Sequence, residues 1–140
     1  MILKLNIIKI GGYIKIDMKE YSELFKENGN DIIGNLSFDN MISENGGRYK
    51  INKLFTYLKN NDFDVSGYYI REKTKVQNIH YHFVLKLENG RDKNELKNMI
   101  FKYWKYNGSV MVKDYNKEIG SFERYMSKSM SFNDFDWNFI

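Results

Sequence analysis

The spacing of apolar residues predicts helices in four segments of the chain. In residues 48–60, Ile51, Leu54, Phe55 and Leu58 follow the i, i+3, i+4, i+7 pattern of one helix face. The same spacing recurs at positions 96, 99, 100, 103 and 104, which predicts a helix over residues 92–105. Residues 118–130 predict a further helix and residues 18–27 a short one.

Runs with strand character lie between these helices. The segments are residues 31–38 (DIIGNLSF), 64–72 (DVSGYYIRE), 79–87 (IHYHFVLKL) and 108–114 (GSVMVKD). The second and third are joined by the polar stretch KTKVQN and are expected to form a hairpin. Residues 2–17 alternate in part around Gly11 and Gly12, which predicts another hairpin, and NGG at 45–47 is expected to break the chain before the helix.

From residue 31 the expected order is β-α-β-β-α-β-α. Strands that alternate with helical crossovers and contain one hairpin predict an α+β fold, in which helices pack on an antiparallel sheet in a ferredoxin-like or RNA-recognition-like (RRM-like) arrangement. At 140 residues we expect one domain over residues 1–140. Residues 31–130 form its core, and residues 1–30 are an N-terminal extension that contains the hairpin.

Composition limits the class of protein. The chain has no cysteine, which excludes a disulfide framework and a thiolate metal site. Its apolar stretches are shorter than a membrane span and are interrupted by lysine, so we expect a cytoplasmic protein with no membrane partner.

The net charge of +4 is unevenly distributed. Residues 1–47 carry five lysines and seven acidic residues, for −2, and residues 48–128 carry seventeen basic and nine acidic residues, for +8. The remaining tail carries Asp134 and Asp136, for −2. A basic middle with interleaved aromatic residues is compatible with nucleic acid, although a solvated lysine-rich surface explains the charge as well.

Both histidines of the chain lie in one strand. His80 and His82 are two residues apart, so they share one face, and Tyr81 and Phe83 belong to the opposite, apolar face that we expect to contact the core. The histidines should therefore lie on the more open face. Paired imidazoles with a carboxylate bind divalent ions, and Glu72 ends the preceding strand of the same hairpin. A chance pair of histidines is the alternative, and the sequence does not fix the register that would place Glu72.

A second candidate site lies in the last predicted helix. Tyr125 and Lys128 are three residues apart and are neighbours on one helix face. Tyrosine can attack a phosphodiester, and its high pKa means that it needs help from a nearby cation at neutral pH. An ordinary amphipathic helix with a half-buried tyrosine would show the same pattern.

Together these motifs resemble those of the HUH endonucleases, and among them the small replication initiator (Rep) proteins of rolling-circle plasmids and viruses. The family's His-bulky-His motif matches HYH at 80–82, its preceding glutamate matches Glu72, and its Tyr-x-x-Lys motif matches YMSK at 125–128. The family's first motif loosely matches GNLSFDN at 34–40. The resemblance covers residues 31–130.

The resemblance implies a metal-dependent enzyme that nicks and rejoins single-stranded origin DNA. It assigns His80, His82 and Glu72 to a divalent ion, Mg²⁺ or Mn²⁺, and it makes Tyr125 the nucleophile and Lys128 its support. The chain lacks a G-x-x-x-x-G-K-[ST] motif, so a helicase of the host or the element would have to act in trans. A viral or plasmid origin is expected, and a homodimer stays open.

Three other interpretations remain open. A single-tyrosine HUH transposase would have a similar size but usually carries Tyr-x-x-x-Gln. A cupin would use His80, His82 and Glu88, but it is all-β and needs a third histidine, which this chain lacks. An RRM-like binding module would explain the basic, aromatic-rich sequence and leave the histidines and Tyr125 without a role.

Overall fold

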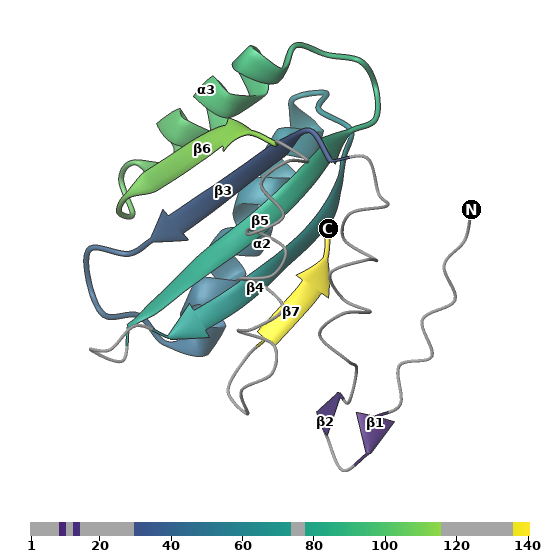
Figure 1. The fold of residues 1–140 in the computed structure, drawn as a ribbon. Coiled ribbons are helices and arrows are strands. Elements are labelled where there is room, and N and C mark those ends of the chain that lie inside the picture. The colour runs from purple at the N-terminus through teal and green to yellow at the C-terminus, as the bar shows by residue number, and fades with distance from the viewer. Residues whose placement is uncertain (1–8, 11–12, 15–29, 74–77, 116–135) are drawn as a thin grey trace.

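A computed structural model describes residues 9–10, 13–14, 30–73, 78–115 and 136–140. Its main body is a five-stranded antiparallel sheet with two helices on one face (Figure 1). The elements run in the order β3 Ile32–Ser37, α2 Glu44–Asn60, β4 Val65–Lys73, β5 Ile79–Leu87, α3 Lys93–Trp104, β6 Val110–Asp114 and β7 Asp136–Phe139. The fold is therefore α+β, as the sequence predicts.

The strand order in this sheet is β6-β3-β5-β4-β7, and every neighbouring pair is antiparallel. The connection from β3 through α2 to β4 passes over β5, and the connection from β5 through α3 to β6 passes over β3. This β-α-β-β-α-β order is compatible with the expected ferredoxin-like or RRM-like arrangement. The helices expected at 18–27 and 118–130 lie outside the described residues.

The short strands β1 (Lys9–Ile10) and β2 (Tyr13–Ile14) pair antiparallel, with Lys9 opposite Ile14 and Ile10 opposite Tyr13. This pairing agrees with the hairpin predicted around Gly11 and Gly12, which themselves lie outside the described residues.

Helix α2 begins four residues before its predicted start, so the expected break at 45–47 is wrong. The Ser43 side chain caps the helix by accepting a hydrogen bond from the Gly46 N–H at 3.0 Å. Gly47 is buried, and a Cβ built there would lie 2.3 Å from Ile79 Cδ1. These glycines start a helix that packs closely on β5, and the closeness explains why a small residue stands at position 47.

Strand β7 is an element that the sequence analysis did not predict. It pairs with β4 through Tyr68 opposite Phe139 and Ile70 opposite Trp137, and the Ile140 N–H donates to the Gly67 carbonyl at 2.8 Å. Four residues in the strand are too few for an alternating pattern to stand out, which is why the tail gave no signal.

The core lies between the sheet and the two helices. Tyr81, Phe83 and Leu85 of β5 are fully buried there, as expected, and they pack with the predicted inward residues of both helices. At the end of α3, the Trp104 indole N–H donates to the Ser37 carbonyl at 2.8 Å, which fixes this helix to the end of β3. Of the described helices, none is long and apolar enough to cross a membrane.

Candidate metal centre

The strand register brings the three predicted metal ligands together. In the β4–β5 pair, Glu72 lies directly opposite His80, and Ile70 lies opposite His82. Directly paired residues of antiparallel strands point to the same face, so Glu72 shares the face of both histidines. The register, which the sequence alone left open, therefore places the carboxylate beside the imidazoles.

One atom from each side chain forms a nearly equilateral triangle. The Glu72 Oε2 atom lies 3.1 Å from His80 Nε2 and 2.8 Å from His82 Nε2, and the two Nε2 atoms are 3.0 Å apart. A search of the described residues for clusters of histidine and acidic side chains that could hold a metal ion finds these three residues.

The size of this triangle matches a metal coordination sphere. Two ligand atoms that each lie about 2.1 Å from an ion, at right angles to each other, are roughly 3.0 Å apart. The three edges of the triangle are all close to that length. The side chains thus fit one triangular face of an octahedral site, which leaves the other positions for water or substrate.

Asn35 on β3 orients His82. It lies opposite His82 in the β3–β5 pair, and its Oδ1 atom is hydrogen-bonded to His82 Nδ1. An amide oxygen only accepts, so Nδ1 carries a proton, and Nε2 is the ring atom that faces Glu72 and His80. The 2.8 Å contact of His82 Nε2 with the Glu72 carboxylate needs positive charge between the two atoms, supplied by a proton on Nε2 or by a cation. A divalent ion supplies that charge to all three atoms at once.

The pKa of Glu72 lies well below its usual range. Hydrogen bonds from His80 and then His82 are the main causes, and partial burial of the carboxyl opposes them. Glu72 is therefore ionised at neutral pH, which is the state that a metal ligand requires.

The surroundings of the triangle are less open than the sequence suggested. The side chains of Glu72 and His80 are 27% and 20% exposed, but that of His82 is only 6% exposed. Ile70 and Val84 lie on the same sheet face as the triad, and both are fully buried. They are not part of the core between the sheet and the helices. The triad lies on the face opposite the helices, as expected, and its access is from the Glu72 and His80 side.

Asn78 fixes the start of β5 next to the triad. Its Nδ2 atom donates to the carbonyls of Phe38 and Asn40, and its Oδ1 atom accepts from the Ile79 N–H at 3.0 Å. The loop after β3 is thereby tied to the strand two residues before His80. Such backbone ties hold metal ligands in position before an ion binds.

The other sequence-predicted site residues fall elsewhere. Tyr125 and Lys128 lie outside the described residues, so their position relative to the triad is not described. Glu88, the third ligand of the cupin interpretation, accepts a hydrogen bond from Ser66 Oγ at 2.7 Å and pairs with Lys86. Together with the α+β fold, this contact removes the cupin interpretation.

Asn35 is the site residue that the sequence analysis missed. It stands within GNLSFDN, the stretch that loosely matches the first HUH motif. No role could be assigned to it because only the pairing of β3 with β5 brings it against His82.

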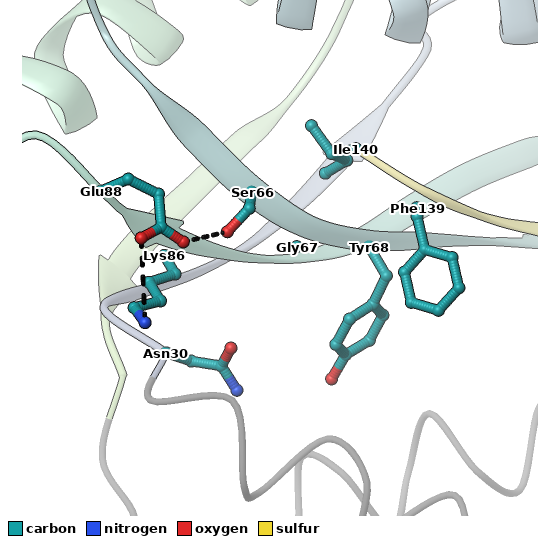
Figure 2. Close-up of a pocket in the computed structure, with 8 residues that line it drawn as sticks. All are labelled: Asn30, Ser66, Gly67, Tyr68, Lys86, Glu88, Phe139 and Ile140. Carbon is teal, nitrogen blue, oxygen red and sulfur yellow. Dashed lines mark hydrogen bonds and ion pairs between the residues drawn. The ribbon is translucent and has the colours of Figure 1, made fainter. Parts of the chain in front are cut away.

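A pocket of about 250 Å³ opens farther along the same sheet face (Figure 2). Its lining includes Tyr68, Lys86 and the exposed ring of Phe139. Tyr68 precedes Glu72 by four residues on β4, a span of roughly 13 Å along a strand. The pocket is therefore separate from the metal centre.

Comparison of the chain with protein-family models, curated proteins and solved structures gives no match.

Proposed function

We propose that this protein is a metal-dependent HUH-type endonuclease that nicks and joins single-stranded DNA to initiate rolling-circle replication of a plasmid or virus. The observation that carries the proposal is the triangle of Glu72 Oε2, His80 Nε2 and His82 Nε2, with edges of 2.8 to 3.1 Å. The β-α-β-β-α-β order, with the histidines on a central strand of the sheet, supports it further.

In the proposed reaction the Tyr125 oxygen attacks a backbone phosphorus atom. The bond from phosphorus to the 3′ oxygen breaks, the phenolic proton is lost, and the 3′ oxygen leaves as a hydroxyl. The product is a 5′-phosphotyrosine, which a 3′ hydroxyl can attack in the reverse direction to join strands. Lys128 would hold the phosphate. A bound divalent ion supplies Lewis acidity at the phosphate oxygens.

The donor set favours one of the two expected ions. Mg²⁺ prefers oxygen ligands, whereas imidazole nitrogen suits transition ions. Two of the three ligand atoms here are imidazole nitrogens. Of Mg²⁺ and Mn²⁺, we therefore expect Mn²⁺ to bind more tightly.

Covalent capture of DNA tests this function. The purified protein is incubated with labelled single-stranded oligonucleotides from the replication origin of its source, with Mn²⁺ or with EDTA, and run on a denaturing gel. We expect a shifted, protein-linked band only with Mn²⁺. Tyr125→Phe should abolish the band because phenylalanine has no oxygen that can attack phosphorus.

The control variants separate loss of chemistry from loss of fold. Tyr115→Phe removes a hydroxyl ten residues earlier in the chain and should leave the band unchanged. His80→Ala with His82→Ala should abolish it through the metal. Absence of any band with wild type, or an undiminished band with Tyr125→Phe, would reject the proposed reaction.

One observation argues against the non-catalytic RRM-like alternative. In such modules, aromatic residues of the central strands stack on bases from the open sheet face. Here Tyr81 and Phe83 of the central strand β5 point to the helices and are fully buried. On the open face β5 presents His80 and His82 instead.

The transposase alternative differs from the replication initiator in the DNA that would be joined. The capture assay distinguishes the two, because its oligonucleotides come from the replication origin.

A further inference from the structure

The helix layer, on the far side of the sheet from the metal triad, carries most of the exposed aromatic surface. Six large apolar or aromatic side chains are exposed among the described residues, and four of them belong to α2, α3 or the turn after α3. These four are Tyr49 at 62%, Tyr57 at 38%, Phe101 at 52% and Tyr106 at 83%. Exposed rings cost solvation free energy, so their concentration on one layer indicates a contact surface.

Lysines stand beside these rings. Lys53 Nζ lies 5.2 Å from the centre of the Tyr49 ring, and Lys105 Nζ lies 5.1 Å from the centre of the Tyr106 ring. Between the two helices, the rings of Tyr57 and Tyr103 stack with centres 4.6 Å apart. A lysine thus lies beside an exposed ring on α2, and another does so in the turn after α3.

Carboxylates compensate the positive charge of the two helices only in part: Lys93 pairs with Asp31, and Lys97 pairs with Asp114. Residues 44–60 and 93–105 hold eight lysines and arginines but only two acidic residues, Glu44 and Glu95. Glu44 pairs with Arg71 and Lys73 on β4, and Glu95 pairs with Arg91, so neither neutralises an outward lysine of the helices. In the described part of the chain, the lysines that form no ion pair include Lys53, Lys59, Lys102 and Lys105.

We propose that this helix surface is a second binding surface for single-stranded DNA, distinct from the metal centre. We define the helix surface by Tyr49, Lys53, Tyr57, Lys102, Lys105 and Tyr106. Lysines that contact phosphates and rings that stack on bases are the combination by which proteins hold single strands without reading sequence. A duplex would use the lysines but leave the rings unused, because its bases are already stacked.

The biological role that we assign to this helix surface rests on the proposed nicking function, whereas its binding of DNA does not. The nicking site would engage one short stretch of strand on the open sheet face. DNA flanking that stretch could then be held on the helix layer, so that the two ends remain attached to the protein during joining. Binding itself needs neither the metal nor Tyr125.

Photocrosslinking on the wild-type protein tests the location directly. A 30-nucleotide DNA strand that contains 5-iodouracil is crosslinked in EDTA, and the attached peptides are mapped. We expect crosslinks at Tyr49, Tyr57 or Tyr106. Crosslinks confined to peptides of β4, β5 or the chain after residue 115 would overturn the proposal, whether or not any variant folds.

Affinity measurements give a quantitative test. We expect Tyr106→Ala and Tyr49→Ala each to weaken binding of the 30-nucleotide strand roughly tenfold. Lys53→Glu should reduce the slope of log affinity against log salt by about 0.7. The matched controls are Met41→Ala, an exposed side chain outside the helices, and Lys93→Glu, whose amine faces Asp31. Equal effects in test and control variants would overturn the proposal, as would tighter binding of RNA of the same sequence.

The two proposals can fail separately. A wild-type protein that forms no covalent band but crosslinks through the helix surface would refute nicking and retain this binding surface. A protein that forms the Tyr125 band but crosslinks only through the sheet would refute the binding surface and retain nicking.

Discussion

Glu72 provides the one charged ligand of the triad, and its replacement should remove most of the metal affinity. Glu72→Gln keeps the shape of the side chain but loses the negative charge and one acceptor oxygen. We expect Mn²⁺ affinity, measured by titration calorimetry, to fall at least tenfold, since even groups that only support metal ligands contribute about ten- to a hundredfold.

Glu88→Gln is the matched control for this change. Glu88 follows β5, and its carboxylate contacts Ser66 and Lys86 rather than the histidines. We expect the Glu88 variant to bind Mn²⁺ as the wild type does. Equal losses in both variants would mean that the triad is not the metal site.

Asn35 should affect the metal through His82 alone. With Asn35→Ala, Nδ1 of His82 loses its acceptor, so the ring can adopt the other tautomer and withdraw the Nε2 lone pair. We expect Mn²⁺ affinity to fall about ten- to a hundredfold. Asn35→Asp restores an acceptor oxygen and should recover most of the affinity. An Asp variant as weak as the Ala variant would show that volume, not the hydrogen bond, matters.

The residues of the site differ in how much structural information is needed to predict their positions. The histidines share a face because any strand alternates, so their position needed only the strand assignment. Glu72 needed the hairpin register as well, and Asn35 needed the pairing of β3 with β5, which joins residues 47 positions apart. Side-chain partners become harder to predict as the pairing that creates them becomes less local.

At the scale of elements, the contact between α2 and β5 depends on the absence of a side chain at Gly47. Glycine to alanine in a helix ordinarily stabilises by about 0.5–1 kcal/mol. Here the added Cβ would meet Ile79 Cδ1 at 2.3 Å and Tyr81 Oη at 3.0 Å. We therefore expect Gly47→Ala to destabilise the fold by about 1–3 kcal/mol in urea denaturation.

A double variant isolates this contact. Ile79→Val removes the Cδ1 atom and should itself cost about 0.5–1.5 kcal/mol. Combined with Gly47→Ala, it should relieve the collision, so that the double variant is more stable than the sum of the single effects predicts. Simple additivity would indicate that another contact, such as that with Tyr81, opposes the alanine.

Most described elements were predictable because their patterns are local. Strand β5 has the predicted bounds, and α3 lies within one residue of its prediction, with Asp92 as N-cap. The start of α2 was not predictable from the glycines, because Ser43 capping and packing on β5 outweigh their low helix propensity. Strand β7 was missed because its place is set by the free edge of β4.

At the scale of the whole molecule, the sheet separates two chemically different surfaces. One face presents the triad with its ionised Glu72, and the other is covered by helices whose charged side chains are mainly lysine. A polyanion is attracted to the helix layer, while a divalent cation is attracted to the carboxylate on the opposite side. The two sides of the sheet therefore attract ligands of opposite charge.

Because the triad joins β4 and β5 in the middle of the fold, metal binding should stabilise the entire domain. The ligand atoms converge only when the strands are paired, so an ion binds the folded chain and not the unfolded one. At a free Mn²⁺ concentration a hundredfold above Kd, the expected gain is about 2.7 kcal/mol, which raises Tm by roughly 5–10 °C. The measurement is a thermal melt in Mn²⁺ against one in EDTA. The His80→Ala, His82→Ala variant, compared with its own EDTA baseline, should show no shift. A similar rise in that variant would place the ion elsewhere on the chain.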